Sequence, residues 1–585
     1  MVDINKLITE NISVWSSAVV KKSTSGRGAS KKIDLIGLHK LRELILDLAV
    51  HGKLVPQIVN AEPASVLLKN IEKEKKQLLQ DKKIKKQKKL PPLGHDERPF
   101  ELPNSWEWCR IGDITNLMSG KGFQKSEYSD SGARLFQIAN VSLGYPKWEV
   151  ENFMPLSYLN DYPELQLAPG DVLIALNRPL LNRRMKICIL SENDMPAILY
   201  QRVGKFNFYE KTINTKFFYY YMQSPLFIDK LNDSLQGSDQ PFINLSQLIN
   251  FVFPLPPAKQ QKLIVSKVDE LMELCDQLEQ RTESGIDARQ LLVKELLSTL
   301  INSTNAAEFK QSWTRVTEYF DLLFSTEDSV EQLKQTILQL AVKGKLVPQD
   351  PKDEHASKLL ERISKEKEQL IKDKVIKKQK ALPDINIDDI EFEIPKSWTI
   401  SRLGEITNYG VCDKAELNDV EDNCWVLELE DVEKITSKLI KKVRVEERQF
   451  KSSKNKFITG DVIYGKLRPY LDKVLVADEC GVCSTEMIPI RAYSSVLPEF
   501  LKMIMKTPYF VDYANNSTHG MNLPRMGTDK ARLAPIIIAP IKEQQRIVSK
   551  VDALFKLCNN LKKSISVSED VKVDLSSAIV DKALR

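Results

Sequence analysis

The stretch at positions 41–57 reads LRELILDLAVHGKLVPQ, and a near-copy at positions 333–349 reads LKQTILQLAVKGKLVPQ. The offset of 292 residues between them holds without a gap through two further pairs of segments: 73–91 with 365–383, and 101–115 with 393–407. Structural repeats of solenoids recur about every 20–50 residues, so this period is far too long for one. The chain therefore contains two copies of half a protein.

Each copy begins with a pattern typical of helices. Apolar residues recur at helical spacing from about Leu35 to Val50, and Gly52 supplies the left-handed residue that ends a helix. Pro63 suits the first turn of a second helix, which runs into a lysine-rich segment at 82–89. The second copy has the matching lysine run at 374–380. These runs are consistent with a solvated helix end, and equally with contact to phosphates or an acidic partner.

Between the helical parts lie two blocks, 106–257 and 398–540, whose short apolar runs, aromatics, glycines and prolines favour strands and loops. FFYYYM at 217–222 is compatible with a short buried helix or a strand. The segments PGDVLIALNRP (169–179) and TGDVIYGKLRP (459–469) correspond, but the interiors otherwise differ strongly. A constant frame with variable inserts is the pattern expected of a protein that reads two different targets.

Long helices are predicted after each block. Apolar residues there follow the 4-3-4-3 spacing of a heptad seam. In the first copy they are Ile264, Val268, Leu271, Cys275 and Leu278, and in the second Ile547, Val551, Leu554, Cys558, Leu561 and Ile565. The seams are short, so they predict an antiparallel coiled coil, a helical hairpin or a small bundle.

Composition narrows the class of protein. The chain has 585 residues, 42% hydrophobic and 28% charged, which predicts several folded domains. Its net charge of +6 is compatible with nucleic-acid binding without requiring it. The start lacks an apolar signal segment, and no apolar run approaches the roughly 18 residues of a membrane span. We therefore expect a cytoplasmic protein with reduced cysteines and no membrane contact.

Signatures of catalysis and metal binding are largely missing. The sequence contains no G-x-x-x-x-G-K-[ST], H-E-x-x-H or G-x-S-x-G, and none of the Asn/Asp-Pro-Pro-Tyr/Phe tetrapeptides that DNA amino-methyltransferases need. The five histidines do not cluster. Cys480 and Cys483 form a lone C-x-x-C without further ligands at a standard spacing, which favours free thiols over zinc. The sequence thus predicts a chain without catalytic or metal sites.

The loops of the two blocks carry residues suited to DNA. Arginine reads guanine, asparagine and glutamine read adenine, and lysine neutralises phosphate. The candidates in the first block are Lys121, Lys125, Arg178, Arg183, Arg184, Gln240 and Asn244. Those in the second block are Lys466, Arg468, Lys473, His519, Asn522 and Arg525. For any single residue a solvated surface charge is the more ordinary interpretation, so the prediction concerns the loops as sets.

The chain resembles the specificity (S) subunits of type I restriction-modification systems. The resemblance rests on the repeated LAV-x-GKLVPQ blocks, the segments LPNSWEW and IPKSW, and the two predicted helices with IVSKVD. The resemblance covers nearly the whole chain. It implies an α+β fold with two target recognition domains, separated by conserved helical regions that form antiparallel coiled coils, in a pseudo-twofold repeat. The segments before the repeats, 1–32 and about 304–330, do not match each other clearly, so strict equivalence is not expected there.

The resemblance also implies a division into regions. They are an N-terminal helical region (1–100), target recognition domain 1 (101–257), a central conserved helical region (258–392), target recognition domain 2 (393–540) and a C-terminal helix (541–585) that completes the distal conserved region. Each recognition domain would read one half of a split, asymmetric target in double-stranded DNA. The helices would set the spacer between the half-sites.

Partners follow from the same resemblance. The helices would dock two modification (methyltransferase) subunits, and restriction subunits with ATP-dependent endonuclease and translocase activity would join them. S-adenosylmethionine, ATP and Mg²⁺ are expected on those partners and no cofactor on this chain. The residues marking the docking helices are Leu41, Leu48, Ile264, Val268, Leu271, Leu333, Leu340, Ile547, Val551 and Leu554. Two other hypotheses remain: a DNA methyltransferase or nuclease acting alone, and a coiled-coil scaffold without a DNA role.

Overall fold

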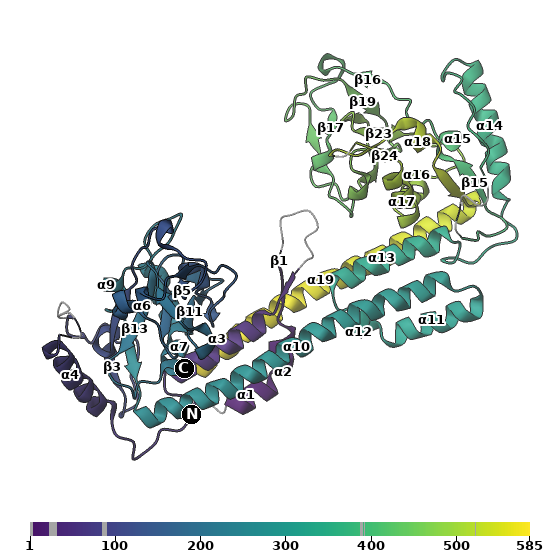
Figure 1. The fold of residues 1–585 in the computed structure, drawn as a ribbon. Coiled ribbons are helices and arrows are strands. Elements are labelled where there is room, and N and C mark those ends of the chain that lie inside the picture. The colour runs from purple at the N-terminus through teal and green to yellow at the C-terminus, as the bar shows by residue number, and fades with distance from the viewer. Residues whose placement is uncertain are drawn as a thin grey trace. The chain divides into compact units, whose positions relative to one another are not determined.

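The computed structural model describes residues 4–22, 32–82, 84, 90–385, 390, 392–520 and 522–584. The chain forms two compact units. Unit 1 comprises Met1–Gly285 and Ser568–Arg585, and unit 2 comprises Ile286–Val567. The boundaries fall inside two long helices, α10 (Ala258–Asn302) and α19 (Ile541–Leu584), so each of these helices contributes to both units (Figure 1). Unit 1 is thus built from both ends of the sequence.

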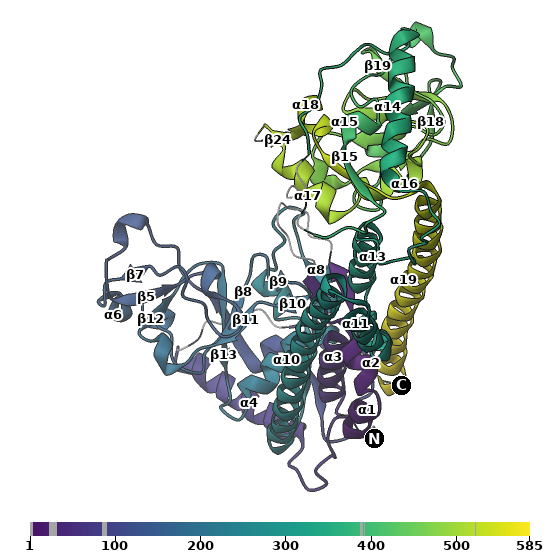
Figure 2. The same ribbon diagram turned by 90° about the vertical axis from the view of Figure 1, so that its right-hand side faces the viewer.

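The helical frame of unit 1 is centred on α3 (Ile36–Val50). Arg42 near its start bonds Asp276 and Glu279 of α10 at 2.6 and 2.5 Å. Beyond its end, the Ile58 N–H donates to Gln260 at the start of α10 at 3.1 Å. The two helices are therefore antiparallel, and they lie side by side in both views (Figures 1 and 2).

Two further parts of unit 1 cover α3. The last turns of α19 run along it, with Lys53 donating to the Leu584 carbonyl at 2.6 Å. The short helices α1 (Ile4–Glu10) and α2 (Ile12–Ser17) pack on it and bury Trp15 completely. Gly37 permits this approach, because a Cβ there would lie 2.4 Å from the Trp15 carbonyl oxygen.

Unit 2 repeats this frame around α13 (Glu327–Val342). Lys334 bonds Asn559 of α19 at 2.7 Å, and Glu331 pairs with Lys562 at 2.8 Å. Lys345, the counterpart of Lys53 in the repeat, donates to carbonyls at the end of α10 at 2.7 Å. The preceding helices α11 (Ala306–Glu318) and α12 (Phe320–Leu323) belong to this unit as well.

The predicted heptad seams are confirmed. Most seam side chains are buried, from Ile264 at 0% exposure to Leu278 at 7%, and Leu554 and Leu561 are partly buried. Gln261 and Gln544 hold equivalent places, since each side chain accepts the N–H just before a domain helix, from Asn214 before α7 at 2.8 Å and from Leu497 before α16 at 3.0 Å. Glu543 therefore replaces Gln260.

The globular domain of unit 1 contains two main sheets. The five-stranded sheet has the order β4 (Thr115–Ser119), β13 (Val203–Phe208), β8 (Val172–Ala175), β11 (Ile187–Ile189) and β6 (Leu143–Gly144). The three-stranded sheet has the order β12 (Ala197–Leu199), β5 (Ala133–Phe136) and β7 (Phe153–Met154). A pair of β3 (Glu107–Arg110) and β14 (Val252–Leu255) closes the domain. FFYYYM forms a helix, α7 (Thr215–Gln223), followed by α8 (Pro225–Ser234).

The globular domain of unit 2 has related elements. One sheet has the order β16 (Lys414–Ala415), β19 (Lys454–Phe457), β22 (Gly481–Cys483), β17 (Trp425–Leu427) and β18 (Val443–Arg444). The other has the order β21 (Val474–Val476), β20 (Val462–Gly465) and β23 (Met487–Ile490). The strands β15 (Thr399–Arg402) and β26 (Pro535–Ile538) pair, and α16 (Pro498–Met505) and α17 (Pro508–Asn516) follow the sheets.

The two domains share the central strand pairings although their sequences diverge and their sheets differ in the outer strands. Strand β8 lies between β11 and β13, and β20 lies between β21 and β23. The registers agree: Val172 faces Ile189 and Phe206, while Val462 faces Val476 and Ile490. Strands β5 and β17 each pair in parallel with a later strand. Hydrophobic burial and strand pairing therefore hold the same fold with different side chains.

An arginine joins each domain to the connecting segment before it, and this arginine is buried in unit 1 and partly exposed in unit 2. The Arg110 guanidinium donates to the carbonyls of Pro91 and Asn250 at 2.9 and 2.7 Å. Its counterpart Arg402 donates to Pro383 and Leu533 at 2.9 and 2.8 Å. Helices α4 (Ala64–Gln80) and α14 (Ala356–Lys372) precede these segments. Most of the lysine run at 82–89 lies outside the described residues, and among the described helices none is long and apolar enough to span a bilayer.

Candidate DNA-binding loops

In unit 1, two loops distant in sequence meet at the end of β8. The Arg178 N–H donates to the Pro241 carbonyl at 2.6 Å, and the Ile243 N–H donates to the Leu176 carbonyl at 2.9 Å. These bonds bring the predicted residue Arg178 beside the loop that carries Gln240 and Asn244, both exposed. The structure thus joins three of the predicted site residues in one loop pair.

Unit 2 contains the same arrangement. The Arg468 N–H donates to the Pro524 carbonyl at 2.7 Å, and the Met526 N–H donates to the Lys466 carbonyl at 3.1 Å. The second loop here is a hairpin of β24 (Thr518–His519) and β25 (Arg525–Met526). It brings the predicted residues His519, Asn522 and Arg525 beside the loop of Lys466 and Arg468.

Arg178 and Arg468 share an unusual backbone conformation. Their φ angles are 45° and 53°, in the left-handed region that residues other than glycine rarely adopt. Each also precedes a proline, which favours an extended conformation instead. Such strain persists only where surrounding contacts hold it, and here the hydrogen bond to Pro241 or Pro524 does so.

The other predicted arginines of unit 1 lie on a hairpin of β9 (Leu180–Leu181) and β10 (Arg184–Met185). Asn182 and Arg183 form its two-residue turn with φ of 49° and 58°, as a type I′ turn requires. Arg183 pairs with Asp229 at 2.8 Å, although both side chains are largely exposed. Arg184 lies next to Tyr219, where burial raises the pKa of the phenol and the nearby guanidinium opposes that rise.

The predicted lysines of unit 1 have separate surroundings. The Lys121 ammonium donates to the Tyr162 hydroxyl at 2.7 Å and lies 4.0 Å from the centre of that ring. Its backbone bridges to Tyr200. Lys125 is exposed in a short 3-10 turn at Lys125–Glu127. These contacts tie the pair to the three-stranded sheet rather than to the loop pair of Arg178.

Two predicted cations of unit 2 are already engaged. Arg525 pairs with Glu486 at 2.9 Å, and this hydrogen bond raises the pKa of the guanidinium. Lys473 donates to the Leu429 carbonyl at 2.6 Å, and burial lowers its pKa. Both groups therefore have structural partners before any ligand binds.

One basic residue of the loop region escapes sequence reasoning. Lys186 directly precedes strand β11, and burial and then the charge of Arg178 lower its pKa. Its backbone carbonyl accepts from Ala175, as that of Lys473 accepts from Gly465, so Lys186 and Lys473 are equivalent. The sequence signal that could have found Lys186 is the correspondence of 169–179 with 459–469, if it is continued into the next strand of each domain.

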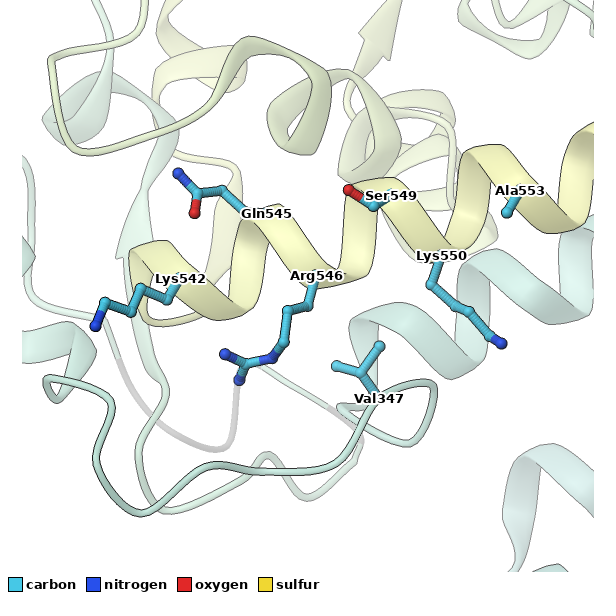
Figure 3. A pocket seen from close by; sticks show the side chains of 7 residues that line it. All are labelled: Val347, Lys542, Gln545, Arg546, Ser549, Lys550 and Ala553. Carbon is cyan, nitrogen blue, oxygen red and sulfur yellow. The ribbon is translucent and has the colours of Figure 1, made fainter.

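The residues that mark the docking helices lie in the cores of their own units. All but Leu554 are buried, with exposures of at most 8%, and Leu554 is partly buried. They hold the helices together, so a partner would contact other faces of these helices. Figure 3 shows one such face on α19, where Lys542, Arg546 and Lys550 line an open groove of about 660 Å³ opposite Val347. Arg546 pairs there with Asp353 at 2.6 Å.

Features of a metal centre do not converge anywhere in the described parts of the chain: no three histidine, cysteine or acidic side chains gather as ligands would. Cys480 is an exposed free thiol and Cys483 a buried one. The fold and the loops define a protein that carries two similar binding domains on a duplicated helical frame. Comparison with known proteins identifies the family to which this protein belongs.

A family profile described as "Type I restriction modification DNA specificity domain" matches residues 103–288. The chain is 35% identical to the type I restriction enzyme EcoAI specificity subunit of Escherichia coli, over 99% of this chain and 100% of that one. It is 34% identical to the EcoEI specificity subunit of Escherichia coli over the same shares. The chain therefore belongs to the family of type I restriction enzyme specificity subunits.

A solved structure, the HsdS subunit from Thermoanaerobacter tengcongensis, is 17% identical. The match covers 84% of this chain and 99% of that one, with a TM-score of 0.39. This likeness is too distant to add to the assignment, which rests on the two relatives that match along their full length.

Proposed function

We propose that this specificity subunit recognises a bipartite, asymmetric sequence in double-stranded DNA, with one globular domain for each half. The observation that carries the proposal is the loop pair that both domains build with the same backbone bonds and different side chains. Around the equivalent prolines Pro241 and Pro524, unit 1 has Gln240, Phe242 and Asn244 at the positions where unit 2 has Leu523, Arg525 and Gly527. Because side chains at base edges set sequence preference, the two domains should prefer different half-sites.

The helical frame would position these domains and bind the catalytic partners. We place two modification subunits on the outward faces of the duplicated helices, and restriction subunits on the resulting complex. The basic stripe of Lys542, Arg546 and Lys550 on α19 is exposed enough to take part. In this proposal the chain itself is not catalytic, and S-adenosylmethionine, ATP and Mg²⁺ act on the partner subunits.

A domain exchange tests the division of labour. Residues 106–256 would be replaced by the corresponding domain of another family member, and the modified bases of the host genome would be mapped. We expect one half of the methylated sequence to change while the other half and the spacer stay the same. A change in both halves would show that the domains do not read independently.

Two measurements distinguish the competing functions. Methyl transfer from S-adenosylmethionine by the isolated chain would support an enzyme that acts alone. Footprinting of the chain together with its modification subunit should reveal two protected segments separated by a fixed spacer. If no such pair of segments is protected, the chain is a scaffold without a role in DNA recognition.

A further inference from the structure

The two loop pairs differ in most side chains, but they retain one pair of cations. Arg178 and Lys186 flank β8 in unit 1, and Arg468 and Lys473 hold the equivalent positions in unit 2. The strand registers and the backbone bonds at Ala175 and Gly465 establish this equivalence. Charge is thus retained at two positions while the adjacent loop residues change.

Carboxylates neutralise many arginines of these domains, but not the two equivalent ones. Arg183 pairs with Asp229, and Arg525 pairs with Glu486. Within the described residues, neither Arg178 nor Arg468 forms an ion pair. In unit 1 the only neighbouring charge that affects the pKa of Lys186 is that of Arg178, and it lowers that pKa further after burial. In unit 1 these two like charges would favour a bound anion, whereas in unit 2 the carboxylates of Asp431 and Glu430 already act on Lys473 and Arg468 is the cation without a carboxylate partner.

The backbone at these arginines also indicates function. A left-handed backbone at a residue other than glycine is strained and therefore costs free energy. The same cost is accepted in both domains, at the residue before a proline, with the same hydrogen bond to a second proline. Glycine would remove the strain, so the retained side chain must contribute something that glycine lacks.

If two domains recognise different DNA sequences, a residue that both domains share cannot be the one that distinguishes those sequences. Contacts to phosphates fix the register of a protein on the duplex and carry no sequence information directly, whereas contacts to base edges specify. The shared arginine suits contact with phosphates, and the divergent second loop suits contact with base edges. A phosphate contact by these two arginines differs from the readout of guanine of which arginine is capable.

We infer that Arg178 and Arg468 are matched phosphate-contacting residues, one in each domain, that position the DNA backbone so that the neighbouring divergent loop can read its half-site. The inference rests on the proposed function for the half-sites, but the phosphate contact itself does not depend on which bases are read. Arg178 would act on the first half-site and Arg468 on the second.

The test uses the complex of the full chain with its modification subunits, bound to duplexes that carry the methylated sequence or an unrelated one. Arg178→Ala and Arg468→Ala should each weaken binding to both duplexes by about tenfold, which is the loss of one charge-assisted bond. Each should also reduce the slope of log affinity against log salt by about 0.9, which is one phosphate. Base preference at every position of the target should remain as in the wild type.

Two further variants make the outcome decisive. Arg134→Ala is the control, because Arg134 lies in the same domain, is not among the candidate DNA-binding residues and is paired with Glu151 at 3.5 Å; it should leave the salt slope unchanged. Arg178→Gly removes the charge and relieves the strain, so it reports on binding even if the alanine variant folds poorly. An unchanged slope in Arg178→Gly would overturn the inference, and so would a relaxed preference at one base pair.

The proposed function and this inference fail in different ways. If the wild-type complex shows no preference for a bipartite target, the half-site proposal fails. The salt slope on unrelated DNA then still measures the phosphate contact. If the target is bipartite but Arg178→Gly and Arg468→Gly bind unrelated DNA as the wild type does, only the inference fails.

Discussion

Replacing Asp47 by asparagine should stabilise unit 1, and the gain should grow as the pH rises. Asp47 lies on α3 with 8% of its surface exposed and accepts the N–H of Leu226 at the start of α8. Burial, followed by the nearby carboxylates of Glu43 and Asp229, raises its pKa from 3.8 to about 7. An amide oxygen can accept the same hydrogen bond without the charge.

The direction in which the stability of unit 1 changes with pH follows from the pKa of Asp47 in the unfolded and the folded state. Between pH 4 and 7 the folded state keeps a proton that the unfolded state releases, so the stability of unit 1 falls through this window and levels off above it. At 1.36 kcal/mol per pKa unit, the full effect is of order 4 kcal/mol at pH 8 and about 1.6 kcal/mol at pH 5. Asp47→Asn should recover these amounts.

Urea unfolding of the full chain at pH 5, 6.5 and 8 measures this gain, with tryptophan emission as the signal. The unfolding transition that shifts in Asp47→Asn gives the change in the free energy of unfolding of unit 1. Gln339 holds the equivalent position in α13 and is already an amide, so it provides the reverse experiment. Gln339→Glu should destabilise unit 2, and more at pH 8 than at pH 5. A gain from Asp47→Asn that is independent of pH, or a loss at pH 8, would refute the reasoning.

Three other substitutions test the packing and the joints of the frame. Leu271→Ala, at a seam position with 1% exposure, should lower the stability of unit 1 by about 2–5 kcal/mol in urea unfolding, and a smaller loss would mean that the helices re-pack around the cavity. Arg110→Leu leaves the carbonyls of Pro91 and Asn250 without their donor and should cost about 1–3 kcal/mol; limited proteolysis should show unit 1 opening, whereas Arg402→Leu should open unit 2. Glu543→Gln should change the melting temperature by no more than a few degrees, because glutamine already holds the equivalent position at Gln260 and can accept the Trp398 N–H at 2.9 Å.

The helical frame could be predicted from the sequence because repetition and periodicity are local signals. The copies at 41–57 and 333–349 fix where α3 and α13 lie, and the heptad spacing fixes which side chains of α10 and α19 are buried. The contact between Gln544 and the Leu497 N–H, 47 residues away, could not be predicted in this way, because no local pattern encodes it.

The candidate DNA-binding loops were chosen by composition and stay a prediction, and their pairing could not be predicted from the sequence. Arg178 and Pro241 are 63 positions apart, and only the strand order brings them together. The left-handed backbone of Arg178 has no sequence signal of its own, because arginine before proline ordinarily predicts an extended residue. Whether an arginine is free or paired, as Arg183 is with Asp229, also depends on tertiary contacts.

Unit 1 takes its last helical segment, Ser568–Arg585, from the end of the chain, and this has a consequence for the order of folding during synthesis. At about 5–20 residues per second, roughly half a minute to two minutes pass between the emergence of α3 and that of the segment that covers it. During this time the face of α3 that receives Ser568–Arg585 stays uncovered. A chain released early would therefore lose part of its first-made unit, although every residue of α3 had been translated.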